Sequence, residues 1–116
     1  MPQVQAKFER LQPGEAVMSV VTYGELLYGV EKHPNRASAL KTLEELVTHI
    51  AVVPMAPVVA HEYSVLRAAL EKKGEIIGNN DLWIAAHALA AGLVLVTNNE
   101  REFKRVPGLK VQNWAA

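Results

Sequence analysis

NNDLWIAAHALAAGLVLVTNN, residues 79–99, is the stretch of sequence that decides the fold. Its alanine-rich first half predicts a helix, and the apolar run 93–96 after Gly92 predicts a buried strand. Asp81 is the only aspartate in the sequence, and it lies in the first turn of this helix, where the helix dipole keeps a carboxylate ionised. A strand that ends in polar residues delivers them to the carboxyl edge of a sheet, where open α/β folds bind ligands. Asp81 and Asn99 are therefore expected to meet there and to form a divalent-metal site.

A structural interpretation of the same residues stays open. Asp in the first turn of a helix is favoured for capping alone, and Asn-Asn after a strand is common in turns. His61 and His87 have no second ligand four residues on, so they are interpreted as core or surface residues rather than metal ligands. Trp83 and Trp114 are interpreted as packing or interface residues rather than as platforms for nucleic-acid bases.

Composition limits the possible classes of protein. The chain has 116 residues, of which 50% are hydrophobic, so we expect a single domain with one core. Its formal net charge is zero, which is unlike the strongly basic balance of many nucleic-acid binders. The absence of cysteine excludes disulfides and thiolate zinc sites and fits a cytoplasmic protein. No stretch has the apolar length of a membrane span or the pattern of a signal peptide.

Helical and apolar periodicities alternate along the chain. Helices are expected over residues 3–11, 23–31, 36–49 and 57–73 and from Asn79, and strands over residues 16–21, 50–53, 93–96 and 109–112. Thr22 with Glu25 predicts a capping box at the second helix. Leu26, Leu27 and Val30 are expected to face inward from that helix. Helices that alternate with strands predict an α/β fold whose parallel sheet is flanked by helices.

Glu25 adds a third oxygen donor to Asp81 and Asn99, because it follows the first predicted strand. Carboxylate and amide ligands, without a His pair, favour Mg²⁺ or Mn²⁺ over zinc. Such an ion typically completes its shell with substrate phosphate, which suggests metal-assisted phosphodiester hydrolysis. The charged stretch 100–105 is interpreted as a solvated face that flanks this cleft.

Three ordered motifs resemble the PIN-domain ribonucleases, above all the VapC-type toxins of bacterial toxin–antitoxin pairs. They are SVVTYGELLYGV at residues 19–30, IGNNDLWIAAHA at residues 77–88 and LVTNNEREF at residues 95–103, and the resemblance extends over essentially all 116 residues. It implies a PIN-like three-layer fold over residues 1–116, with a parallel sheet between helices. It also implies Mg²⁺- or Mn²⁺-dependent cleavage of RNA, a homodimer and inhibition by a VapB-type antitoxin.

The resemblance also implies roles for individual residues. Glu25 matches the helix glutamate of the family's acidic cluster, and Asp81 matches its central metal-binding aspartate. Asn99 matches the fourth position, which is Asp or Asn in the family, and Thr97 matches the hydroxyl residue that orders the site. Two residues beside these, Glu102 and Asn80, are further candidates.

The chain departs from the family's pattern at its beginning. Such toxins start with a central strand that reads roughly Leu-Asp-Thr-Asn and carries the first metal ligand, and this sequence has no such segment. We expect another strand, a swapped strand or a rearranged sheet to fill the gap, and we expect weak metal binding and little cleavage. Two main functions are thus weighed, a metal-dependent endoribonuclease toxin and a catalytically incomplete module that binds an antitoxin or second subunit. A nucleotide-binding domain is disfavoured, since no Gly-rich phosphate loop follows any strand.

Overall fold

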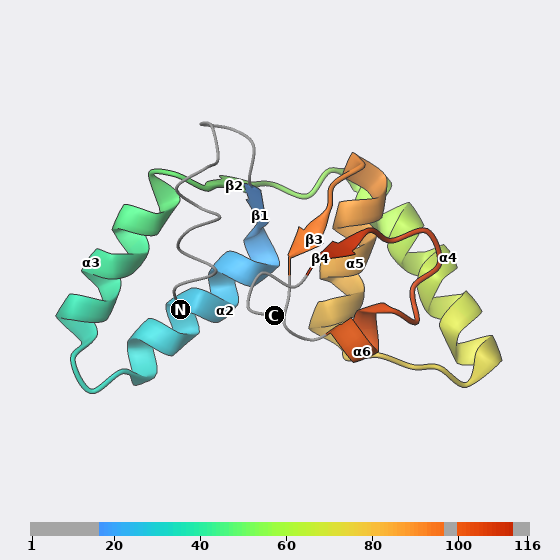
Figure 1. Cartoon of the computed structure of the whole chain (residues 1–116), viewed down its shortest axis with the longest axis horizontal. Helices are drawn as coiled ribbons and strands as arrows, with labels where there is room; N and C mark the ends of the chain where they lie inside the picture. Colours follow the sequence, from blue (N-terminus) through green and yellow to red (C-terminus); the bar gives the residue numbers. More distant parts are fainter. Residues whose placement is uncertain (1–16, 97–99, 113–116) are drawn as a thin grey trace. The chain divides into compact units, whose positions relative to one another are not determined.

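The computed structural model describes residues 17–96 and 100–112, and these fall into two compact units. We call residues 17–54 the N-terminal unit, and residues 55–96 with 100–112 the C-terminal unit. Each unit contains helices and one pair of parallel strands (Figure 1). The helix expected over residues 3–11 lies outside the described residues.

The N-terminal unit begins with strand β1 (Val17–Ser19), which passes directly into helix α2 (Val20–Lys32). Ser19 is the N-cap of α2, and its Oγ accepts a hydrogen bond of 3.0 Å from the backbone N–H of Thr22. The predicted capping box of Thr22 and Glu25 was therefore wrong, as was the longer first strand. Serine is at least as good an N-cap as threonine, so the helix starts at the earlier hydroxyl.

Strand pairing sets the same boundary. Strand β2 (Ala51–Val53) runs parallel to β1, and the register ends with Ser19 opposite Val53. Pro54 follows and has no N–H to donate to a ladder, so β1 has no partner beyond Ser19. Helix α3 (Arg36–Val47), capped by Asn35, lies between α2 and β2 in the chain, as predicted apart from its last two residues.

Apolar residues of α2 and α3 divide between the core and the surface. Val30 is buried, as predicted, Leu27 is half-buried, and Leu43 of α3 is buried as well. Leu26 is 38% exposed, so the prediction that it faces inward was wrong. Four residues correspond to about 400°, so Leu26 is only about 40° from Val30 around the helix, and its exposure does not come from lying on another helix face.

The C-terminal unit is built on two packed helices, α4 (Pro57–Lys73) and α5 (Asn79–Ala91). Both follow the predicted boundaries. Pro57 occupies the first turn of α4, where a missing N–H costs nothing, and Gly74 ends this helix with a positive φ of 70°. Side chains of these helices, of the loop between them and of the segment after α5 share one core, made of Leu66, Leu70, Ile77, Leu82, Ala85, Phe103 and Val106.

The last part of the C-terminal unit forms its two-stranded sheet. Strand β3 (Leu95–Val96) pairs in parallel with β4 (Val111–Gln112), and both are shorter than predicted. Helix α6 (Glu100–Phe103) lies between them in the chain, and its Phe103 is only 3% exposed. This charged segment is thus anchored in the core through one aromatic residue. None of the helices in the described part of the chain is long and apolar enough for a membrane span.

Candidate functional site

Asp81 is the third residue of α5 and is half-buried. The N-cap of α5 is Gly78, which has no side chain to cap the helix. Asp81 therefore does not serve as the N-cap, which was the structural interpretation of this residue. Its carboxylate still lies at the positive end of the helix dipole, which favours the ionised form.

The carboxylates of Asp81 and Glu102 border the same small space beside Gly78. A Cβ atom added to Gly78 would lie 3.7 Å from Asp81 Oδ2 and 3.5 Å from Glu102 Oε1. The backbone N–H of Gly78 also donates a short hydrogen bond to Glu102 Oε1. From the sequence Glu102 was only a secondary candidate, whereas the structure places it beside Asp81, the main candidate.

A second contact holds the same loop against the end of α6. The Arg105 guanidinium donates a hydrogen bond of 2.7 Å from Nη1 to the carbonyl oxygen of Ile76. Glu102 and Arg105 thus bind two backbone groups only two residues apart, at Gly78 and Ile76. Since Phe103 and Val106 are buried beside them, the position of Glu102 is set by the core.

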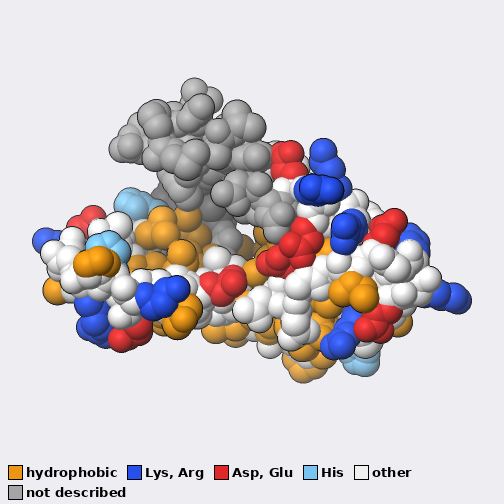
Figure 2. All heavy atoms as spheres, turned by 90° about the horizontal axis from the view of Figure 1, so that it is seen from below, with side chains coloured by type: hydrophobic (Ala, Val, Ile, Leu, Met, Phe, Trp, Pro, Cys, Tyr) orange, Lys and Arg blue, Asp and Glu red, His pale blue; other side chains and the backbone are white. Residues whose placement is uncertain are grey.

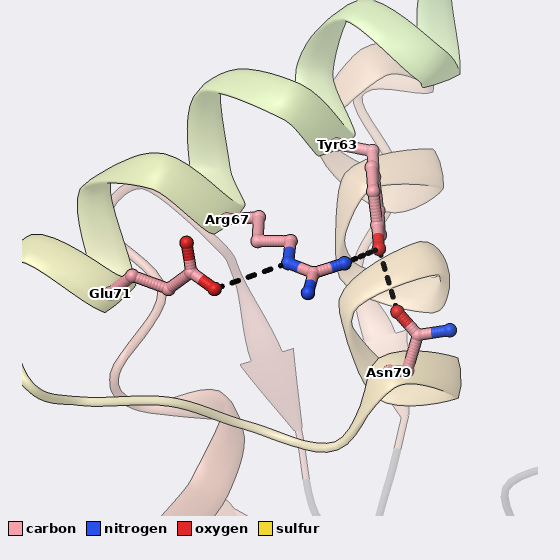
Figure 3. A network of polar contacts seen from close by, with 4 residues as sticks. All are labelled: Tyr63, Arg67, Glu71 and Asn79. Atoms are coloured by element: carbon pink, nitrogen blue, oxygen red, sulfur yellow. Dashed lines mark hydrogen bonds and ion pairs between the residues drawn. The ribbon is translucent and has the colours of Figure 1, made fainter.

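A polar network lies along the other side of the start of α5 (Figure 3). Tyr63 Oη donates a hydrogen bond of 2.6 Å to Asn79 Oδ1 and accepts one of 2.8 Å from Arg67 Nη1. Arg67 Nε in turn lies 3.3 Å from Glu71 Oε2. Sequence reasoning missed this network, although the spacing of four between Tyr63, Arg67 and Glu71 was a signal that the three share one helix face.

Other predicted site residues lie elsewhere. Glu25 is on α2 in the N-terminal unit, where its side chain is exposed, and its approach to Asp81 stays a prediction. Asn99 and Thr97 lie outside the described residues, as does Trp114. Asn80 is exposed in the first turn of α5.

The histidines and Trp83 behave as structural residues. His61 is exposed on α4, whereas His87 is 6% exposed on α5. Burial lowers the pKa of His87, and its Nδ1 has no hydrogen-bond partner among the described residues. Trp83 stacks on Tyr63 with ring centroids 3.8 Å apart, which agrees with its predicted packing role.

The donor set fits a hard divalent ion. Within the described ranges no group of three His, Cys, Asp or Glu side chains is placed to hold a metal, and the converging pair is Asp81 with Glu102. Mg²⁺ is commonly held by one or two carboxylates, with water and substrate phosphates completing its shell. The space over Gly78, which any larger residue would fill, is bordered by such a pair.

The charged side chains on the face that Figure 2 shows give no separate sign of a nucleic-acid site. In the face that Figure 2 shows, acidic and basic side chains are intermixed over the C-terminal unit. This agrees with the formal net charge of zero. Contacts with a polyanion on this face would therefore depend on single residues and on the acidic pair rather than on a broad basic patch.

Comparison with known proteins identifies the family. The family model of the PIN domain matches residues 3–109. The chain belongs to the PIN-domain family. It is similar to "Ribonuclease VapC2" of Haemophilus influenzae, with 39% identity over 101 residues that cover 87% of this chain and 76% of the relative. It is also 39% identical to the "tRNA(fMet)-specific endonuclease VapC" of Shigella flexneri, over 90% of this chain and 80% of that protein.

Solved structures of similar fold include VapBC complexes. VapBC-1 from nontypeable Haemophilus influenzae matches with a TM-score of 0.90 and 34% identity, over 100% of this chain and 87% of that chain. The DNA-bound VapBC of Salmonella typhimurium matches with a TM-score of 0.90 and 35% identity, over 97% of this chain and 84% of that chain. These likenesses confirm the predicted α/β PIN fold, with its parallel sheet flanked by helices, and the VapC type of this chain.

Proposed function

We propose that this PIN-domain protein is a divalent-metal-dependent endoribonuclease toxin of a type II toxin–antitoxin pair. The observation that carries the proposal is the meeting of the Asp81 and Glu102 carboxylates beside Gly78 in a VapC-type chain. Sequence relatives named ribonucleases support the reaction, because the chain covers about three quarters or more of their length. Residues 1–116 would form a single PIN-like domain.

The residues of the site have separate tasks in this proposal. Asp81 and Glu102 would hold Mg²⁺ or Mn²⁺, with Glu25 and Asn99 as the further ligands that the family resemblance implies. The bound ion would polarise the phosphodiester and lower the pKa of an attacking water. Asp81 presents a charged oxygen at the start of α5, and Glu102 is kept in place by the Gly78 N–H. Gly78 itself keeps open the space that the phosphate and the ion require.

The partners are inferred from the relatives. The Shigella flexneri relative is named for cleavage of tRNA(fMet), so an initiator tRNA is the first RNA to test. The similar solved structures are complexes of toxin with antitoxin, and we infer a VapB-type antitoxin for this chain. We further propose a homodimer, which light scattering at micromolar concentration would detect as twice the chain mass.

Metal titration combined with an RNA cleavage assay tests the proposal. We expect Mn²⁺ binding by calorimetry and cleavage of an initiator tRNA that EDTA stops. Asp81→Asn should lose both, because the amide keeps the shape but not the charge that holds the ion. Glu44→Gln, on the exposed face of α3, is the matched control and should change neither. Cleavage that resists EDTA or survives Asp81→Asn would reject this metal site.

One observation favours a second function, a module that binds its partner without cutting RNA. The residues that the structure describes bring together two acidic side chains and no third. If two carboxylates hold the ion too weakly, the protein would still bind a VapB-type antitoxin. Tight antitoxin binding with no Mn²⁺ binding and no cleavage at any metal concentration would decide for this alternative.

A further inference from the structure

The side chain of Tyr63 contacts α5 at two residues that bracket Asp81. Its hydroxyl bonds Asn79 at 2.6 Å, and its ring stacks on Trp83 with an angle of 9° between the planes. Asn79 and Trp83 are four residues apart, so they lie on one face of the helix, one turn from each other. One side chain of α4 therefore holds the whole first turn of α5 along that face.

The direction of the Tyr63 hydroxyl is determined by its neighbours. A guanidinium can only donate, so Tyr63 Oη must accept from Arg67 and point its single proton at Asn79 Oδ1. Arg67 is in turn bonded to Glu71, one turn further along α4 (Figure 3). The hydrogen bonds thus run outward from Arg67, to Glu71 on one side and through the Tyr63 hydroxyl to Asn79 on the other.

Asp81 lies on the opposite side of the same helical turn. Two residues correspond to a rotation of about 200° at 3.6 residues per turn, so Asp81 points away from the face that Tyr63 holds. On that opposite side its Oδ2 borders the space beside Gly78, together with Glu102. A rotation of the first turn of α5 would move the Asp81 carboxylate relative to Glu102.

We propose that Tyr63 is a positioning residue for the metal-binding carboxylate of Asp81, and that it acts through Asn79 and Trp83. The proposal rests on the metal site proposed above. Tyr63 holds α5 on the face opposite Asp81. Its task is to set the rotation of the first turn of α5, so that Asp81 and Glu102 face one point.

Two substitutions and their combination test this role in the full chain without RNA. Tyr63→Phe removes the hydroxyl and leaves a ring that can stack on Trp83, whereas Asn79→Ala removes the acceptor. Calorimetric titration with Mn²⁺ should show affinity weakened roughly three- to tenfold in each, the scale of one lost hydrogen bond. The double variant should be no weaker than the single ones, since both remove the same contact. Tyr28→Phe is the matched control, because Tyr28 is 62% exposed on α2, and it should bind as the wild type does.

A second readout follows the helix turn itself in the metal-free protein. Amide hydrogen exchange of residues 80–83, measured by NMR, should become faster in Tyr63→Phe and Asn79→Ala and stay unchanged in Tyr28→Phe. Far-ultraviolet circular dichroism checks that each variant is folded. Asn79→Ala is the fallback if Tyr63→Phe unfolds.

The outcomes separate this inference from the proposed function. A wild-type chain that binds no Mn²⁺ would overturn the metal site and the positioning role together. Wild-type binding with unchanged affinity in both Tyr63→Phe and Asn79→Ala would overturn the positioning role alone. Additive losses in the double variant would show that Tyr63 does not act through Asn79.

Discussion

Helices α2 and α5, which both carry candidate acids, begin in different ways. Helix α2, which carries Glu25, is capped by Ser19, the residue directly before it. Helix α5, which carries Asp81, begins after Gly78, has no side-chain cap of its own and is held by Tyr63 and Glu102 from other elements. A local cap specifies where a helix starts, whereas contacts from two other helices also specify how its first turn is rotated. A carboxylate in a metal site requires this fixed rotation, because the rotation sets the direction of the side chain.

The largest expected effect comes from detaching α6 from the core. Phe103→Ala removes a side chain that is 3% exposed, and we expect the free energy of unfolding to fall by about 3–5 kcal/mol. Glu102 and Arg105 would lose their support at Gly78 and Ile76, so Mn²⁺ affinity should fall as well. Urea unfolding and calorimetry measure the two effects. Tyr28→Ala, a change at an exposed aromatic residue, is the control. Its free energy of unfolding and its Mn²⁺ affinity should change by only a small fraction of the changes in Phe103→Ala.

Glu102→Gln sharpens the comparison at α5 itself. The amide oxygen can still accept from the Gly78 N–H, so stability should fall by less than about 1 kcal/mol. The lost charge should weaken Mn²⁺ binding by about tenfold or more. Glu25→Gln, on the exposed face of α2, measures in the same titration whether that acid joins the site. Equal affinity in wild type and Glu102→Gln would remove Glu102 from the proposed ligands.

His87 gives α5 a dependence on pH. Burial lowers the pKa of His87 in the folded chain below its ordinary value of 6.5, so the unfolded chain takes up the proton first as the pH falls. The contribution of the neutral His87 to the free energy of unfolding is therefore fully present above about pH 6.5. It is lost as the pH drops below that value, by at most about 1.4 kcal/mol per pH unit. Urea unfolding between pH 5 and 7.5 measures this slope.

His87→Asn is the variant that checks the assignment. It removes the titrating group, so the slope of stability against pH should become smaller than in the wild type, whatever the absolute stability. An unchanged slope would assign the dependence to other residues. The described histidines of the N-terminal unit, His33 and His49, are exposed and serve as sites for control substitutions.

The smallest expected effect is at the local cap of α2. Ser19→Ala removes the acceptor for the Thr22 N–H, and we expect a loss of about 1 kcal/mol in urea unfolding. Ser19 is not among the proposed ligands, so Mn²⁺ affinity should change far less than in Glu102→Gln. Ser19→Asp keeps a capping oxygen and should recover most of the stability. A metal affinity that follows the cap would contradict the contrast between the two helix starts.

Much of the fold was predictable where the signals are local. Pro57 and Gly74 mark the ends of α4, and the apolar spacing of Val59, Leu66 and Leu70 marks its buried face. The ends of the short strands were harder to predict, since they depend on the partner strand. Pro54, directly after the partner strand β2, ends the ladder at the pair of Ser19 and Val53, and no window around Ser19 contains that information.

The sequence by itself determined the order of the longer helices and of the strands in the described residues, the helix that carries Asp81, and the oxygen donors that are candidate ligands. It did so because periodicity, capping residues and ligand type are properties of neighbouring residues. Only the tertiary structure decided that Glu102 joins Asp81 at Gly78 and that Tyr63 holds Asn79 and Trp83. The first contact spans 24 residues and the second 16, and such contacts are selected by the packing of whole helices around buried residues such as Phe103 and Leu70.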